Sequence, residues 1–233
     1  MLVRTFAIAF AICLSLNAAP KQGISVLTTQ HVNFAPGGAI RVTGSLGELN
    51  IEGWDRSEVE VRFTRTLYRE DTPATRQRVK QDLEAIRVTA SQPAAGQLVL
   101  STVFPKHKFP ASLFAKYEVN LDYRIMVPRN SKLEITHDSG DVTIYDVAGD
   151  IQARIRTGDI VAQLPQTGQY NIDARSGLGT VYTDFGGAYR APFLVGQRFA
   201  GTTTGPARQI TFHTGAGGIS ILKMSAPAAA PLP

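Results

Sequence analysis

The sequence predicts an all-β protein, a β-solenoid or β-roll-like stack of short strands with a nine- to ten-residue period and one inserted α-helix. The first sign is a recurring Gly-Asp pair, at Gly140-Asp141, Gly149-Asp150 and Gly158-Asp159. The glycines at 140, 149, 158, 168 and 177 are nine, nine, ten and nine residues apart. The second sign is that the positions two and four residues after each glycine are mostly apolar, whereas the position between them is mostly polar. One such unit is too short to bury a core, so the units must stack.

Residues 1–19 have the pattern of a secretory signal peptide. Arg4 supplies the basic region, Phe6 to Leu16 form an apolar stretch too short to span a membrane, and Asn17-Ala18-Ala19 supplies small residues for cleavage. We therefore expect an exported protein in the periplasm, the cell envelope or the extracellular space. The remaining domain is expected to cover residues 20–225.

Cys13 is the only cysteine. It could be the lipidated residue of a lipoprotein signal, but the preceding Ile12 is larger than the residue such a signal requires. If the signal is cut at Ala18 or Ala19, the mature chain has no cysteine, which excludes disulfides and thiol catalysis.

The net charge of +5 mildly favours anionic surfaces, a cell-surface polysaccharide or an envelope protein as partners. No nucleic-acid-binding motif and no transmembrane anchor is found, and the oligomeric state stays open. The Ala- and Pro-rich residues 226–233 are expected to form a flexible tail.

The first strand is expected from Ile24 to Asn33. The repeat register then begins at Gly38 and Gly47, long before its clearest copies. Alternation from Val59 to Phe63 and from Tyr117 to Val127 predicts two more strands, each with one buried face.

One helix is expected at about residues 72–86. Asp71 or Thr72 can cap it, Pro73 suits its first turn, and Val79 and Leu83 begin an apolar stripe. Strands resume at residues 86–90 and 97–103.

An irregular loop is expected at about residues 104–116. It carries the candidate ligand contacts Lys106, His107, Lys108 and Phe109, since basic and aromatic side chains suit sugars or acidic polymers. The alternative is a connection that covers one end of the core. Near the C-terminus the pattern weakens between Tyr189 and Pro206 and returns at Gly215 as a closing coil.

The six Gly-Asp residues are interpreted as structural turn residues. Glycine permits a positive φ or close approach between coils, and aspartate can accept hydrogen bonds from turn amides. Gly149→Val should therefore cost more than an outward change such as Gln152→Ala. A calcium-stabilised β-roll is the alternative, although the extra glycines of calcium-binding nonapeptides are absent.

At these residues the chain resembles the putative-adhesin family of bacterial secreted β-solenoid proteins, whose repeats read Ser/Thr-Gly-Asp-Val/Ile. Residues 47–55, Val59-Glu60-Val61 and the segment from Tyr123 to Pro128 resemble the family's strands ahead of the repeats. The resemblance covers Ala39 to Ile221. It implies an extracytoplasmic, non-enzymatic, adhesin-like module with no catalytic residues.

No catalytic, cofactor or metal motif occurs, so the sequence predicts no enzyme and no cofactor. His137-Asp138-Ser139 contains triad residue types, but neighbours on a strand point to opposite faces. The alternative is a polysaccharide lyase or glycoside hydrolase that uses an outward sheet face. Outward Asp173 and Arg175, with Arg154 and Arg156 two coils away, could line such a face.

Overall fold

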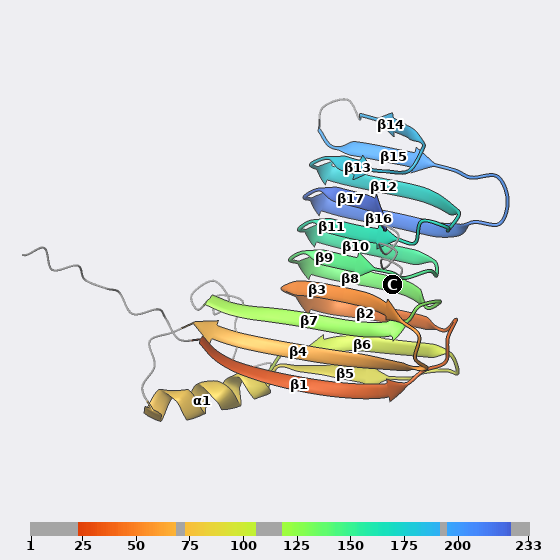
Figure 1. Cartoon of the computed structure of the whole chain (residues 1–233). Helices are drawn as coiled ribbons and strands as arrows, with labels where there is room; N and C mark the ends of the chain where they lie inside the picture. The colour runs from red at the N-terminus through yellow and green to blue at the C-terminus, as the bar shows by residue number, and fades with distance from the viewer. Residues whose placement is uncertain (1–22, 69–72, 106–117, 192–194, 225–233) are drawn as a thin grey trace, which may run out of the picture.

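The computed structural model of the protein describes residues 23–68, 73–105, 118–191 and 195–224. Over these residues the chain forms two β-sheets, each with parallel and antiparallel strand pairs, and one helix (Figure 1). The expected signal peptide, the end of the chain from residue 225 and most of the 104–116 loop lie outside the described residues.

Sheet I has eight strands. In spatial order they are β1 (Gly23–Asn33), β4 (Glu58–Tyr68), β7 (Glu118–Pro128), β3 (Glu48–Trp54), β9 (Val142–Tyr145), β11 (Ile160–Leu164), β17 (Ile219–Lys223) and β13 (Val181–Thr183).

Sheet II has nine strands and packs face to face with sheet I. In spatial order they are β14 (Ala188–Arg190), β15 (Gln197–Gly201), β12 (Tyr170–Leu178), β16 (Arg208–Ala216), β10 (Ile151–Thr157), β8 (Lys132–Ser139), β2 (Ala39–Leu46), β6 (Gln97–Val103) and β5 (Arg87–Ser91).

The nine-residue period places successive strands alternately in the two sheets. Strand β8 lies in sheet II and β9 in sheet I, and β10 and β11 repeat this arrangement one layer further on. Parallel pairing aligns equivalent residues of the repeats, so that Ile151 lies opposite Leu133 and Ile160 opposite Val142. These aligned apolar side chains are buried and form the continuous core between the sheets.

The all-β prediction with one helix is confirmed, but a solenoid is not what the structure has. A solenoid stacks its coils in chain order, whereas the closing pair β16 and β17 lies between β10 and β12 in sheet II and between β11 and β13 in sheet I. The antiparallel strands β15 and β14 then complete that end of sheet II. The period does not specify the neighbour of each strand, because every repeat offers similar apolar columns and the same backbone hydrogen bonds.

Helix α1 (Pro73–Glu84) ends two residues before the predicted limit and lies beside β1 (Figure 1). Its buried Val79 and Leu83 pack with Ile24 and Leu67 in a small second core.

Arg65 on β4 connects this helix to sheet I. Its side chain is 2% exposed, and its guanidinium lies 4.8 Å from the centre of the Phe63 ring. It donates hydrogen bonds to the carbonyl oxygen of Leu83 on α1 (3.4 Å), to that of Ile86 just beyond the helix (2.7 Å) and to the Thr28 hydroxyl. Burial lowers the pKa of Arg65, and these acceptors compensate the buried charge.

Candidate functional site

A row of basic side chains crosses the outer face of sheet II. In order along the sheet it contains Arg154 on β10, His213 on β16, Arg175 on β12, Arg198 on β15 and Arg190 on β14. Each residue is the register partner of the next, so all five lie on the same face. Alternation of the strands explains this placement, because the flanking residues Ala153, Ala174 and Phe212 are buried in the core. We call these five residues the basic row.

Four of the five residues of the basic row, all except Arg190, border an open hollow of about 370 Å³. The hollow is lined by Arg154, Asp173, Arg175, Arg198, Thr211, Phe212 and His213. The Phe212 side chain is buried beneath it, so the accessible surface is formed mainly by charged and polar groups.

Asp173 is the only carboxylate that lines the hollow among the described residues. It accepts two hydrogen bonds from Arg198, at 2.8 Å from Nε and 2.7 Å from Nη2. This bidentate contact raises the pKa of Arg198 and fixes the orientation of its guanidinium group.

The other arginines of the basic row have no such partner. Within the described ranges, Arg154, Arg175 and Arg190 form no ion pair and no side-chain hydrogen bond, and all three are exposed. Elsewhere on the same face Arg41 pairs with Glu134 at 2.6 Å, and Lys132 lies 3.7 Å from Asp150. Positive charge is therefore uncompensated at one end of sheet II.

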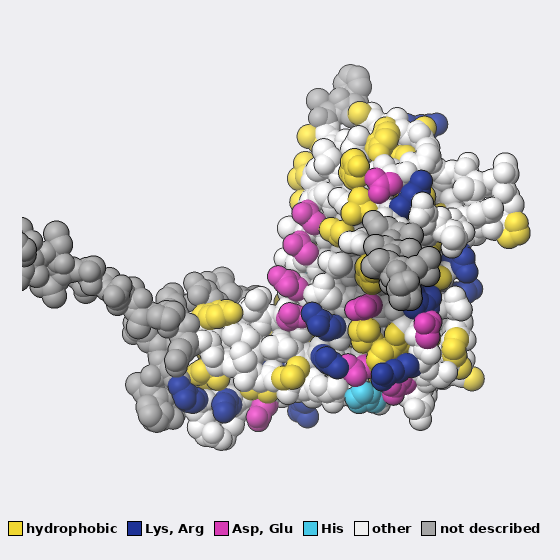
Figure 2. Space-filling model, in the orientation of Figure 1, with side chains coloured by type: hydrophobic (Ala, Val, Ile, Leu, Met, Phe, Trp, Pro, Cys, Tyr) yellow, Lys and Arg dark blue, Asp and Glu magenta, His cyan; other side chains and the backbone are white. Residues whose placement is uncertain are grey.

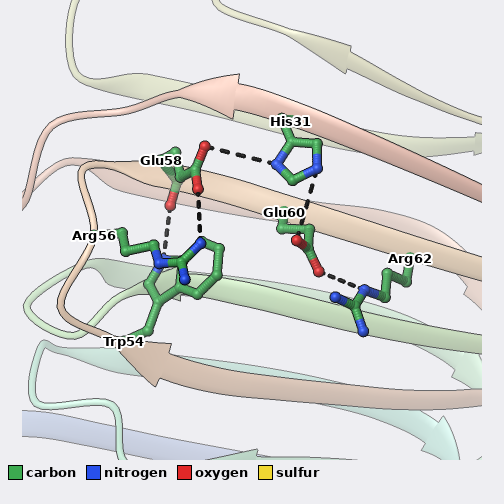
Figure 3. Close-up of polar contacts among 6 residues, drawn as sticks. All are labelled: His31, Trp54, Arg56, Glu58, Glu60 and Arg62. Atoms are coloured by element: carbon green, nitrogen blue, oxygen red, sulfur yellow. Dashed lines mark hydrogen bonds and ion pairs between the residues drawn. The ribbon is translucent and has the colours of Figure 1, made fainter.

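A second polar cluster, on the outer face of sheet I, is internally paired (Figure 3). His31 lies 3.6 Å from Glu58 and 3.7 Å from Glu60. Arg56 pairs with Glu58 at 3.5 Å, and Arg62 Nε lies 2.5 Å from Glu60 Oε1.

Glu60 is 6% exposed, and its Oε1 makes the contact with Arg62 without a hydrogen bond of regular geometry in the described part of the chain. Trp54 donates from Nε1 to the Glu58 carbonyl oxygen at 2.8 Å and stacks beneath Arg56. The acids and bases of this cluster satisfy one another, and it leaves no charge free for a ligand.

The six predicted turn residues lie where the chain passes between the sheets. Gly140 and Gly158 have φ angles of 117° and 133°. A Cβ atom at Gly140 would lie 2.0 Å from the Gly47 carbonyl oxygen. Gly149 has no positive φ, but a Cβ there would lie 2.0 Å from the carbonyl oxygen of Ser131.

The three turn aspartates accept hydrogen bonds from backbone amides of the neighbouring layer. Asp141 Oδ1 accepts from the Asp159 amide at 2.9 Å, and Asp159 Oδ1 accepts from the Gly218 amide at 2.7 Å. Asp150 Oδ1 accepts from the Gln209 amide at 3.0 Å.

The strand register of sheet I aligns four acidic residues, Asp122, Glu48, Asp141 and Asp159. Figure 2 shows acidic side chains that follow one another in a column on the surface. No group of three or more His, Cys, Asp or Glu side chains that could hold a metal is found in the part of the chain that the structure describes.

The remaining sequence-predicted residues divide into two groups. Lys106, His107, Lys108 and Phe109 lie outside the described residues. Asp173, Arg175 and Arg154 are brought together in one hollow, whereas Arg156 lies further along β10 and does not line it.

Sequence reasoning missed Arg190, Arg198 and His213. The two arginines fall in the stretch with weak alternation, where no outward face could be assigned. His213 follows the outward position Thr211 on β16 at a spacing of two residues, which is the signal that could have placed it.

No family model matches the chain, and no curated protein matches it in sequence. Solved structures that are similar to it in three dimensions include the three described next. A putative cell adhesion protein from Clostridium sporogenes is 14% identical, with 85% of this chain and 100% of that chain covered and a TM-score of 0.48. A putative adhesin from Parabacteroides merdae is 12% identical, with 67% and 63% covered and a TM-score of 0.33.

The third, a putative adhesin from Bacteroides fragilis, is 13% identical, with 85% and 97% covered and a TM-score of 0.26. At such identities and TM-scores these likenesses support no argument about function. Among the described residues α1 is the sole helix, and it is neither long enough nor apolar enough to cross a membrane.

Proposed function

We propose that this chain is a non-enzymatic binding module of an exported protein, and that it attaches to an anionic polysaccharide through the basic row on sheet II. The observation that carries the proposal is the contrast within one face. Arg154, Arg175 and Arg190 are exposed without an acidic partner, whereas Arg41 and Lys132 on the same sheet are paired.

The chemistry of arginine supports an anionic ligand. A guanidinium group is planar and can donate two parallel hydrogen bonds to a carboxylate or a sulfate. Side chains in register on neighbouring strands repel one another when their charges are alike. A bound polyanion would relieve this repulsion and would be attracted by the combined field of the row.

A polysaccharide fits this face better than a nucleic acid does. Proteins that bind single-stranded nucleic acids combine basic grooves with exposed aromatic rings on which the bases stack. Among the residues that the structure describes, the only ring that lines the hollow apart from His213 is Phe212, and it is buried. The resemblance to the putative-adhesin family and the export expected from residues 1–19 agree with a polysaccharide of a cell surface.

Glycoside hydrolysis has less support than binding. It usually needs two carboxyl groups on opposite sides of the scissile bond, and the single carboxylate of the hollow, Asp173, is engaged by Arg198. A lyase would instead need a base beside a neutralising cation, and His213 with Arg175 offers those residue types.

The test is retention of the purified chain on immobilised polygalacturonate, with dextran as the neutral matrix. We expect retention on polygalacturonate alone. The double variant Arg154→Gln/Arg175→Gln should lose it, while the paired-cation control Arg41→Gln should keep it.

The same samples should be assayed for new reducing ends and for unsaturated products. Binding without products supports the proposal. Equal retention of the double variant, or turnover that the double variant loses, would overturn it.

A further inference from the structure

The register of sheet II indicates how an anionic ligand would lie on it. The five residues of the basic row belong to five adjacent strands, β10, β16, β12, β15 and β14. Neighbouring strands in a sheet are about 4.8 Å apart, so the row extends over about 19 Å. It runs across the strands and along the direction in which the layers stack.

The surface beside the row is free of side chains at two positions. Gly177 and Gly215 lie just beyond Arg175 and His213 along their strands, and their backbones are in contact, since a Cβ at Gly177 would lie 2.6 Å from the Gly215 carbonyl oxygen. Toward the other end of the strands, Thr211 and Asp173 border the hollow. The row therefore lies between a hollow and a flat strip of backbone.

We infer that the ligand is a linear polyanionic glycan, with a carboxylate or sulfate on its repeating units, and that it lies along the basic row and crosses β10, β16, β12, β15 and β14. This inference rests on the proposed function. The unpaired arginines Arg154, Arg175 and Arg190 stand on every second strand of the row, so anionic groups that recur along an extended chain can meet them in turn.

Three members of the row have distinct positions in this arrangement. Arg154 and Arg190 are the two ends, four strand spacings apart. Arg175 is the centre and borders the hollow together with the Asp173–Arg198 pair. A short oligosaccharide bound at the centre would reach neither end, whereas a longer one would reach both.

The experiment is calorimetric titration of the purified chain with galacturonate oligomers of two, four and six units. For the wild type, affinity should rise about tenfold between the dimer and the hexamer, because the hexamer adds contacts at the two end arginines and each exposed ion pair contributes about a factor of three. Arg175→Gln should weaken binding at every length. Arg154→Gln and Arg190→Gln should weaken binding of the hexamer and leave the dimer unchanged.

Arg156→Gln is the matched control, because Arg156 lies on the same strand and face as Arg154 but outside the row and the hollow. It should leave all affinities within about twofold. Changes at the row residues should also keep the melting temperature, since these exposed side chains contribute little to folding.

The outcomes separate the inference from the proposed function. Equal affinity for all lengths, with no effect of Arg190→Gln, would overturn the linear arrangement and leave a site for a short anion at the hollow. A loss with Arg156→Gln as large as with Arg154→Gln would also overturn it. Absence of binding to every oligomer and to polygalacturonate would overturn both the linear arrangement and the proposed function. Tighter binding to single-stranded DNA of equal charge would show that the ligand of the basic row is a nucleic acid and not a glycan.

Discussion

Ser45 Oγ lies 2.6 Å from His137 Nδ1, and both side chains are buried between the sheets. The other ring nitrogen, Nε2, lies 2.9 Å from the carbonyl oxygen of Gly47. A carbonyl oxygen can only accept a hydrogen bond, so Nε2 carries a proton and Nδ1 accepts from the Ser45 hydroxyl. Both ring nitrogens of the neutral imidazole therefore have a hydrogen-bond partner inside the protein. Protonation of Nδ1 would remove its ability to accept from Ser45, so the arrangement depends on pH.

Lowering the pH should destabilise the fold through His137. Burial lowers the pKa of His137 from its ordinary value of 6.5, so below pH 6.5 the unfolded chain binds a proton that the folded chain does not. Stability is fully present above pH 6.5 and falls as the pH decreases below it. Urea unfolding of the wild type and of His137→Gln from pH 8 to pH 5 measures the pH-dependent contribution of His137 to the free energy of unfolding.

The free-energy difference between the wild type and His137→Gln should be constant above pH 7 and should shrink below pH 6.5. This comparison cancels the titration of the exposed carboxylates, which both proteins share. A difference that does not change with pH would show that His137 does not titrate differently in the folded and unfolded chains.

Replacing Gly149 tests the close approach of the layers. The new Cβ of Gly149→Ala would lie 2.0 Å from the Ser131 carbonyl oxygen, so the backbone must move. We expect a loss of about 2 kcal/mol or more in the free energy of unfolding. The exposed control Gln152→Ala should stay within about 0.5 kcal/mol of the wild type, and equal losses for the two variants would contradict the assignment of Gly149 as a structural turn residue.

Arg65 should be essential for the attachment of α1. In Arg65→Met the carbonyl oxygens of Leu83 on α1 and of Ile86, and the Thr28 hydroxyl, lose their donor, which should cost about 3 kcal/mol in chemical denaturation. Arg78→Met changes an exposed arginine on α1 itself and should be nearly neutral. A loss below about 1 kcal/mol for Arg65→Met would mean that water or neighbouring groups replace the guanidinium.

Asp173 limits the positive charge of the basic row. Asp173→Asn releases Arg198 from its bidentate contact and adds one net positive charge, so polygalacturonate should bind several-fold more tightly at low salt and with a steeper salt dependence. Glu134→Gln releases Arg41 away from the row and should leave the affinity unchanged. Weaker binding by Asp173→Asn would instead show that Asp173 itself contacts the ligand.

Much of the fold follows from alternation and turn residues. The strand expected at residues 97–103 is β6 with the same bounds, and the helix differs by only one or two residues at either end. The position of β16 could not be predicted, because Ile210 and Phe212 would fit equally well at the end of the stack. Its insertion is what places His213 between Arg154 and Arg175.

The candidate site was only partly predictable for the same reason. Alternation shows that Asp173, Arg175 and Arg154 point outward, but it does not show which charges meet across strands. Arg198 and Arg190 lie on antiparallel strands that break the repeat. The register that places Arg198 opposite Arg175, and Arg190 opposite Arg198, therefore depends on strands without a periodic signal. Arg198 and Arg190 could be assigned to the basic row only from the strand register of the structure.

The most direct measurement is the map of backbone amide chemical-shift changes when the isotope-labelled chain is titrated with a galacturonate hexamer. Binding along the basic row predicts that the largest changes fall on β10, β16, β12, β15 and β14, with few on sheet I. Changes concentrated on the cluster around His31, or on the segment from Lys106 to Phe109, would contradict the assignment of the binding face to sheet II.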